Sequence, residues 1–157
     1  EGAEPVAGCS AMAVPDPAML PCPHCGAVNR VPAARLADHP ACGRCKAPLF
    51  QGRPISLDEA GVRLHRDRGS LPLLVDVWAG WCGPCRAMAP AFEQAAAALE
   101  PQVRLAKVDI DAAPAFAAAL GIQSVPTLIL FRNGREQARS TGALALPQIL
   151  TFARQAA

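Results

Sequence analysis

LPLLVDVWAGWCGPCR, residues 71–86, is the stretch that decides the fold, because an apolar run leads through a short turn into two closely spaced cysteines. The run from Leu71 to Trp78 is almost continuously apolar, which is typical of a strand covered on both faces. Beyond the cysteines, apolar side chains recur at helical spacing as far as Leu99. The pattern places Cys82 at or next to the N-terminus of a helix.

The rest of the chain continues this alternation of strands and helices. Residues 56–59, SLDE, have the form of a helix capping box, Asp111 is the expected cap of a short helix, and Asn133-Gly134 indicates a two-residue hairpin turn. We expect, in order, a short strand near 55, a helix at 56–68, a strand at 71–78, a helix at 82–99, a strand at 103–109, a short helix at 111–121, strands at 127–131 and 136–141, and a last helix from about 146. This order predicts an α/β fold, a mixed central sheet flanked by helices and closed by an antiparallel hairpin.

The segment from Cys82 to Cys85 favours thiol–disulfide chemistry. Free N–H groups and the positive end of the helix dipole stabilise a thiolate at Cys82, and Pro84 falls in the first turn, where no N–H is needed. Cys85 lies one turn deeper and can attack a mixed disulfide on Cys82 within the same molecule. A metal site or plain buried thiols are the alternative, which we disfavour because no second pair of cysteines follows in the C-terminal part.

The motif resembles the active site of the thioredoxin family, and the resemblance covers residues 53–157. It rests on residues 75–86, VDVWAGWCGPCR, and on landmarks at Pro90, 107–109, 125–127, 133–134 and 142–143. Val77 and Arg86 depart mildly from it, since many members have phenylalanine and lysine there. The resemblance implies a thioredoxin fold and a protein-disulfide reductase that a flavin-dependent thioredoxin reductase recycles.

Asp76 is unusual because a carboxylate inside an apolar strand is costly to bury in its ionised form. Burial is expected to raise the pKa of Asp76 toward neutrality, so that it can take a proton, through water, from Cys85. Lys107 shares strand parity with Val103 and Leu105, and the resemblance implies that its ammonium lies near Asp76. An exposed Asp76 and a solvated Lys107 are the alternatives that the sequence leaves open.

Pro126 is ambiguous from the sequence, since few X-Pro peptide bonds in folded proteins are cis. The family resemblance implies a cis bond between Val125 and Pro126, with the proline facing the cysteine pair and the Val125 backbone free to pair with an extended substrate. The same resemblance implies a small apolar docking surface, which consists of Trp81, Gly83, Pro84, Gly142 and Ala143. Ordinary turn and core-edge roles are the alternative for these residues.

A second set of cysteines lies near the N-terminus, where Cys22 and Cys25 are followed, after sixteen residues, by Cys42 and Cys45. This spacing is usual for a structural zinc site with four thiolate ligands and no open position. Residues 19–50 hold few aliphatic side chains and no periodic segment, so we predict a small zinc module that cannot fold on hydrophobic burial alone. One structural Zn²⁺ per chain and no organic cofactor are expected.

His24 and His39 are alternative ligands, but either would break the symmetry of the two cysteine pairs. CPHC, residues 22–25, is also the literal sequence of the redox pair in bacterial periplasmic thiol oxidases, although no strand or helix is predicted to frame it here. A zinc module ahead of a thioredoxin domain resembles the zinc-binding second type of bacterial thioredoxin, and residues 20–157 match that arrangement.

Composition limits other interpretations. A net charge of +2 without a basic run indicates neither nucleic-acid nor membrane binding, and no apolar stretch is long enough to cross a bilayer. No signal peptide is recognisable, so we expect a soluble, monomeric, cytoplasmic protein whose seven cysteines serve metal or redox chemistry. Residues 1–18 are interpreted as a flexible or non-native tail, and Cys9 within them has no assigned role.

Two functions from different classes remain. The leading hypothesis is an enzyme that reduces disulfides in proteins with Cys82 and Cys85. The runner-up is a zinc-dependent binding module or holdase in which the thioredoxin-like domain only senses oxidation. Reduction of insulin disulfides separates the two, because a holdase needs no turnover. A zinc ribbon that binds nucleic acid is a weaker alternative, since the aromatic and basic interleaving of single-strand binders is missing.

Overall fold

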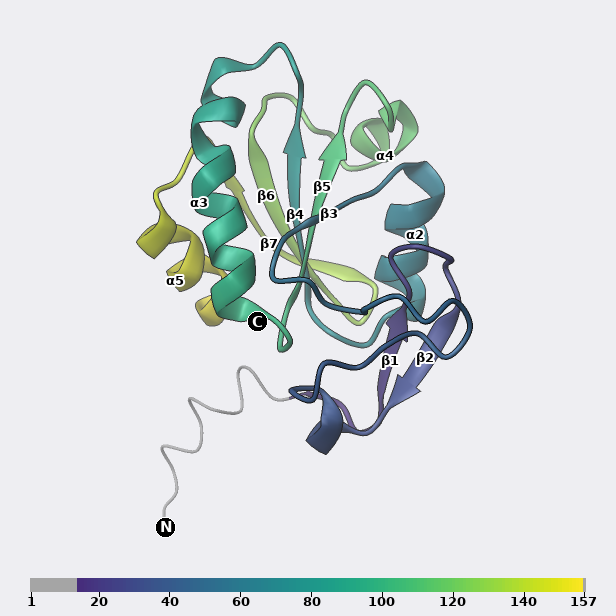
Figure 1. The fold of residues 1–157 in the computed structure, drawn as a ribbon. Coiled ribbons are helices and arrows are strands. Elements are labelled where there is room, and N and C mark those ends of the chain that lie inside the picture. Colours follow the sequence, from purple (N-terminus) through teal and green to yellow (C-terminus); the bar gives the residue numbers. More distant parts are fainter. Residues whose placement is uncertain (1–13, 157) are drawn as a thin grey trace.

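The computed structural model describes residues 14–156, so residues 1–13 of the predicted tail, with Cys9, lie outside the described residues. In chain order the elements are β1 (Ala18–Pro21), β2 (Val28–Val31), a 3₁₀ turn η1 (Ala33–Arg35), β3 (Ile55–Ser56), α2 (Glu59–Arg68), β4 (Leu73–Trp78), α3 (Gly83–Leu99), β5 (Arg104–Asp109), α4 (Pro114–Ala119), β6 (Thr127–Arg132), β7 (Arg135–Thr141) and α5 (Leu146–Ala156) (Figure 1). No helix in this part of the chain is long and apolar enough to cross a membrane.

Five strands form one mixed sheet in the order β3-β5-β4-β6-β7. Strands β3, β5 and β4 run parallel, β6 joins β4 in the antiparallel sense, and β7 returns beside β6. Figure 1 shows α3 and α5 on one side of this sheet and α2 and α4 on the other. The element order confirms the α/β prediction, including the short strand at Ile55.

Each face of the sheet has its own apolar core, because neighbouring side chains of a strand point to opposite faces. On the side of α3 and α5, Leu74 packs in a cluster with Met88 and Phe92. On the side of α2 and α4, Val75 packs in a cluster with Phe116. Burial of one such side chain contributes about 1.5–3 kcal/mol, so the two cores hold the helices firmly against the sheet.

The hairpin that closes the sheet is the one the sequence predicts. Asn133 and Gly134 join β6 to β7, and both have left-handed backbone angles, with φ of 54° and 77°. A two-residue turn of this kind requires positive φ at both central positions, which Asn-Gly tolerates better than other pairs. The hairpin brings β7 back beside β6 and leaves it as one edge of the sheet.

The start of α2 differs from the sequence prediction. Ser56 lies in β3, where it pairs with Lys107 of β5, so it is not available as a helix cap. Asp58 caps α2 instead and accepts a hydrogen bond from the Gly61 N–H at 2.7 Å. The predicted capping box is therefore wrong.

Glu59, the second member of that predicted box, caps a different helix. Its carboxylate accepts hydrogen bonds from the backbone N–H groups of Ala115, at 2.7 Å, and Phe116, at 3.1 Å, in the first turn of α4. Ala113 is the N-cap residue of α4 and offers no side-chain acceptor. The expected cap at Asp111 is also wrong, because the packing of α2 beside α4 supplies the acceptor from elsewhere in the chain.

The N-terminal module is built around two short antiparallel frames. Strands β1 and β2 pair around the first C-x-x-C segment, and a bridge between Ala41 and Pro48 frames the second. Ala18, the last residue of the predicted tail, is the first residue of β1 and is fully buried. The sequence did not predict these frames, because segments of four residues are too short to show an alternating pattern.

The module packs directly against the α/β domain. Its Leu20 and Leu49 share one apolar cluster with Leu71, which precedes β4. The Met19 N–H donates to Ser70 Oγ at 2.7 Å, and the Ser70 N–H donates to the Met19 carbonyl at 3.0 Å. These paired hydrogen bonds fasten β1 beside the C-terminal end of α2, where Figure 1 also places it.

Candidate active site and metal centre

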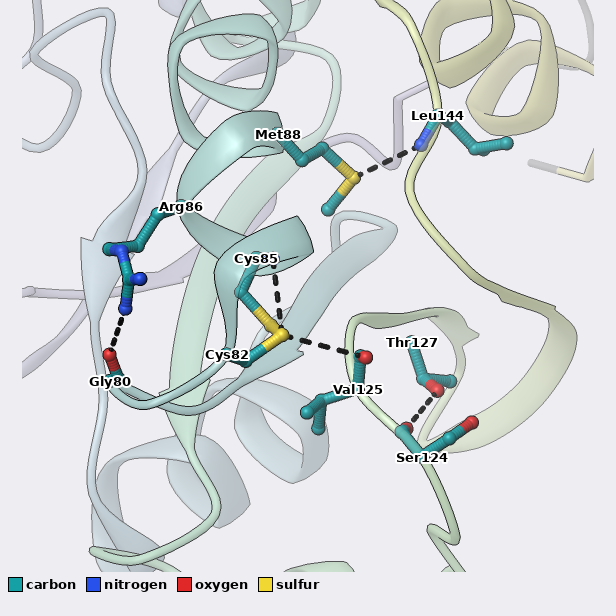
Figure 2. The surroundings of a disulfide bond; sticks show 9 residues. All are labelled: Gly80, Cys82, Cys85, Arg86, Met88, Ser124, Val125, Thr127 and Leu144. Atoms are coloured by element: carbon teal, nitrogen blue, oxygen red, sulfur yellow. Dashed lines mark hydrogen bonds between the residues drawn. A yellow bond between two sulfur atoms is a disulfide. The ribbon is translucent and has the colours of Figure 1, made fainter.

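The turn between β4 and α3 presents Cys82 as the N-cap residue of α3. Its Sγ accepts a hydrogen bond from the Cys85 N–H at 3.1 Å (Figure 2), and Pro84 lies in the first helical turn. A helix leaves its first N–H groups without intrahelical partners, and these groups stabilise negative charge. The location therefore favours a thiolate at Cys82 once the pair is reduced.

Cys82 and Cys85 form a disulfide in this structure, across a Cα separation of 5.3 Å. Their exposed fractions are 5% and 3%, respectively. Both side chains belong to a small apolar cluster with Ala79, against which Val125 packs. The pair thus lies just after the end of β4 and is almost fully buried.

The loop before β6 faces this pair. Cys82 Sγ lies 3.6 Å from the carbonyl oxygen of Val125 (Figure 2), and the Val125–Pro126 peptide bond is cis, as the resemblance implies. The Gly142 N–H donates to the Pro126 carbonyl at 2.9 Å, which holds the segment after β7 beside the same loop. Residues far apart in the sequence therefore meet around one sulfur atom.

The remaining residues of the predicted docking surface are accessible. Trp81 is the exposed large hydrophobic side chain of the described residues, with 67% of its surface accessible. Gly83, Pro84 and Ala143 are also exposed, and Gly142 is half-buried. The exposed Trp81 indole next to the buried disulfide is consistent with the expected apolar docking surface.

Asp76 lies in β4 and is completely buried. Its two carboxylate oxygens have no hydrogen-bond partner among the described residues. Burial raises the pKa of Asp76 from 3.8 to about 7, and the nearby charge of Lys107 opposes that rise. A carboxyl group with such a pKa exchanges its proton readily near neutral pH.

Lys107 is the direct neighbour of Asp76 in the pairing of β4 with β5. It is half-buried, and its Nζ lies 4.8 Å from the centroid of the Trp78 ring. Lys107 also lines a groove of about 590 Å³ between the N-terminal module and the α/β domain, together with His24 and Asp58. The groove brings solvent to the ammonium group of Lys107.

The four N-terminal cysteines form one compact cluster. Their Sγ atoms all lie within 4.8 Å of one another. The distance is 3.6 Å both from Cys22 to Cys45 and from Cys25 to Cys42. Four sulfurs at about 2.3 Å from a tetrahedral Zn²⁺ lie about 3.8 Å apart, so the cluster fits a metal site of that kind.

Backbone N–H groups surround these sulfurs. Cys22 Sγ accepts from the N–H groups of His24, at 3.3 Å, and Cys25, at 3.5 Å. Around Cys42, hydrogen bonding from the Cys45 N–H, and then from Asn29, lowers the pKa of the thiol to about 5. A hydrogen bond from the Ala47 backbone acts in the same sense on Cys45, but burial and the neighbouring thiols raise the pKa of Cys45 to about 11. Cys42 is therefore the thiol whose surroundings favour the thiolate, the form that binds a metal.

The histidine alternatives lie outside this cluster. His24 Nε2 is 3.4 Å from Gln51 Nε2, and the group of potential ligands found among the described residues consists of the four cysteines alone. Cys22 and Cys25 are unbonded thiols between two strands and do not begin a helix. This environment does not support the interpretation of the CPHC sequence as the redox pair of a periplasmic oxidase.

Sequence reasoning missed one residue of the metal centre. Asn29 in β2 donates from Nδ2 to the Ala27 carbonyl at 3.1 Å and accepts at Oδ1 from the Gly43 N–H at 2.9 Å. It therefore connects the two cysteine turns and orients them toward each other. The only sequence signal was an amide side chain four residues after the first cysteine pair, which is too common to single out.

Comparison with known proteins follows the same division of the chain. Residues 65–155 match the family model described as thioredoxin, and residues 21–47 match a zinc-ribbon model described as thioredoxin 2, N-terminal. The chain belongs to the thioredoxin family. "Thioredoxin C-3" of Corynebacterium nephridii is 45% identical over 126 residues, which cover 80% of this chain and 86% of that relative.

Further relatives match the thioredoxin domain. A thioredoxin of Haemophilus influenzae is 39% identical over 85 residues, which cover 54% of this chain and 79% of that protein. The solved structure of a mutant thioredoxin from Halobacterium salinarum superimposes with a TM-score of 0.61 at 26% identity, and the match covers 68% of this chain and 93% of that one. The protein is thus a thiol–disulfide oxidoreductase with a zinc-ribbon module of the thioredoxin 2 type.

Proposed function

We propose that this thioredoxin reduces disulfides in protein substrates, with Cys82 as the nucleophile and Cys85 as the resolving cysteine. The observation that carries the proposal is the place of Cys82, which caps α3 and faces the Val125 carbonyl while Cys85 lies below it. Cys82 and Cys85 are joined as a disulfide, which is the oxidised form in which one round of substrate reduction ends.

In the first step the Cys82 thiolate attacks one sulfur of the substrate disulfide. The substrate S–S bond breaks, a mixed disulfide with Cys82 forms, and the departing substrate thiolate takes up a proton from water. An extended substrate pairs with the backbone at Val125. The apolar surface around it consists of Trp81, Gly83, Pro84, Gly142 and Ala143, and the buried Pro126 forms the cis bond that follows Val125.

In the second step Cys85 resolves the mixed disulfide. The ionised Asp76 carboxylate takes the Cys85 proton through water, and the Cys85 thiolate attacks Cys82 Sγ. The mixed disulfide breaks, the second substrate sulfur leaves, and the two substrate thiols hold the two electrons that the Cys82–Cys85 pair has given up. Lys107 favours the ionised form of Asp76, which keeps part of that population able to accept a proton at neutral pH.

The metal centre has a structural role in this proposal. Cys22, Cys25, Cys42 and Cys45 would hold one Zn²⁺, and this metal would stabilise the fold of the small module formed by residues 19–50. Residues 53–157 form the thioredoxin domain. We further propose that the protein acts as a cytoplasmic monomer and that a flavin-dependent thioredoxin reductase returns it to the dithiol form.

Turnover of insulin disulfides by Cys82→Ser and Cys85→Ser tests the assignment, with thioredoxin reductase as the electron source. Cys82→Ser should lose all turnover. Cys85→Ser should also stop, but only after it has formed a mixed disulfide that can be isolated on a non-reducing gel. Activity in Cys82→Ser, or no trapped adduct with Cys85→Ser, would contradict the roles. A wild-type protein that binds client proteins but never turns over would support the holdase alternative.

A further inference from the structure

Arg104 is an arginine that lies inside the molecule, at the boundary between the zinc-ribbon module and the thioredoxin domain. It is the first residue of β5, and only 4% of its surface is exposed. Arginine is rarely buried unless its charge is paired, because removal of the guanidinium from water is costly. The contacts around Arg104 therefore indicate how its charge is stabilised inside the protein.

Three contacts hold the guanidinium. Nη2 donates to the carbonyl oxygen of Leu49 at 2.6 Å, the group stacks over the Phe50 ring at 4.3 Å from its centroid, and Nη1 lies 3.6 Å from Glu100 Oε2. Glu100 in turn accepts from the Gly52 N–H at 3.0 Å. Arg104 and Glu100 of the thioredoxin domain thus both bind the backbone of residues 49–52, the segment that follows the metal-binding module.

That segment is continuous with the second cysteine turn. The Leu49 N–H donates to the Pro40 carbonyl at 3.0 Å, and the Cys42 N–H donates to the Ala47 carbonyl at 2.8 Å. Leu49 is fully buried in the cluster that also contains Cys22 and Cys42. Arg104 therefore binds the carbonyl group of a residue whose own N–H group holds the segment around Cys42 and Cys45.

The guanidinium of Arg104 keeps its charge inside the protein. Burial lowers the pKa of Arg104 to about 10, and the negative charge of Glu100 opposes this fall, so the guanidinium stays charged at neutral pH. His65, whose pKa burial lowers to about 4, is neutral there and adds no competing charge.

We propose that Arg104 is a positioning residue for the metal centre, which fastens the second cysteine turn to β5, so that metal retention and the stability of the thioredoxin domain are coupled. The proposal rests on the four cysteines binding zinc. The coupling is reciprocal, because a contact that stabilises the metal-bound module against the domain also stabilises the domain when metal is bound.

Chelator-driven release of zinc from the full chain measures the first half of the coupling. Arg104→Met keeps much of the side-chain volume and removes the charge, and Arg104→Lys keeps the charge. Arg154→Met, at an exposed position of α5, is the matched control. We expect release about tenfold faster or more from Arg104→Met, partial rescue in Arg104→Lys, and the wild-type rate in Arg154→Met. Unchanged thiolate-to-metal absorption of the Co²⁺-loaded variants would show that all four ligands are still bound.

Thermal unfolding followed by tryptophan fluorescence measures the second half, since both tryptophans, Trp78 and Trp81, lie in the thioredoxin domain. Removal of zinc from the wild-type protein should lower the Tm of this signal, and in Arg104→Met the difference should shrink. An Arg104→Met variant that releases zinc at the wild-type rate, or a wild-type Tm unaffected by zinc removal, would overturn the inference. If Arg104→Met does not fold, the wild-type comparison still decides it. If the purified wild-type protein binds no zinc at all, the proposal that the four cysteines hold a metal is itself wrong.

Discussion

The first cysteine pair of the zinc ribbon and the pair of the thioredoxin domain have the same spacing and different surroundings. Cys82 caps a helix of seventeen residues and is bonded to Cys85 within its own turn. Cys22 and Cys25 lie between two antiparallel strands, and each has a sulfur atom of the other cysteine turn at 3.6 Å. The element that follows the pair, and not its spacing, therefore determines whether its sulfurs bond to each other or converge on a metal.

The second cysteine turn of the ribbon supports this conclusion. Cys42 Sγ accepts from the Arg44 and Cys45 N–H groups at 3.3 and 3.5 Å, the same distances as at Cys22. The redox turn shares the bond from the N–H of the second cysteine, but it lacks the other bond, because Pro84 lies two residues after Cys82 and has no N–H. The chain therefore contains three cysteine pairs with identical spacing, of which two face a metal site and one forms a disulfide.

Alkylation should produce the largest difference between the two regions. In the reduced, zinc-loaded protein we expect iodoacetamide to modify Cys82 completely before any of the four zinc-ribbon cysteines reacts. The reason is that a thiolate at a helix N-terminus is free to attack, whereas a metal-bound thiolate has its lone pairs engaged. Mass spectrometry of peptides over time measures the order of modification.

A Cys9→Ser background removes the thiol that lies outside the described residues. Zinc removal before alkylation is the control, and it should make the four ribbon cysteines reactive without changing Cys82. Early modification of Cys25 or Cys45 in the zinc-loaded protein would show that the ribbon thiols are not protected.

Asp76 should give the next largest effect, because the redox site has a buried carboxyl group. Above its ordinary pKa of 3.8, the unfolded chain loses this proton, while the folded chain keeps it up to about pH 7. The free energy of unfolding therefore falls as pH rises through this range and stays low above it. Asp76→Asn removes the titration, so its stability relative to wild type should rise by about 3 kcal/mol between pH 5 and pH 8.

Urea unfolding at several pH values measures this difference, with Glu93→Gln on the exposed face of α3 as the matched control. The same Asp76→Asn variant should resolve mixed disulfides more slowly near neutral pH. A pH-independent difference in stability between Asp76→Asn and wild type would contradict a buried, protonated carboxyl group.

Glycine substitutions should give the smallest effects and oppose each other in sign. Gly26 has φ of +78° and an added Cβ would lie 3.4 Å from Leu64 Cδ2, so Gly26→Ala should cost about 1–2 kcal/mol. Gly83, at the start of α3, has nothing within 4 Å of such an atom. Gly83→Ala should be neutral or stabilise by about 0.5 kcal/mol. Equal losses in the two variants, measured by urea unfolding, would show that the two turns have the same backbone requirements.

Much of this structure follows from local sequence patterns. Strand β4, helix α3, the Asn133-Gly134 hairpin and the four-cysteine cluster were predictable, because each depends on periodicity, on a turn preference or on ligand spacing that nearby residues determine. The family resemblance supplied the cis bond at Pro126, which a single sequence does not distinguish from the more common trans form.

The features that escaped prediction depend on tertiary packing. Asp58 replaced Ser56 as the cap of α2 because β3 pairs with β5, and that pairing involves residues about fifty positions apart. Arg104 looks in the sequence like an ordinary basic residue at the start of a strand. Its burial is decided by Leu49 and Phe50 from the other region, which no local pattern reveals.

Helix α4 depends on another helix for its first turn. It has six residues, fewer than a helix needs to be stable alone, and its side-chain cap comes from Glu59 on α2. The amide hydrogens of Ala115 and Phe116 should therefore exchange with deuterium at the rate at which α2 opens, instead of the faster rate of a frayed helix end. The two helices form one unit of local opening, joined by a single carboxylate.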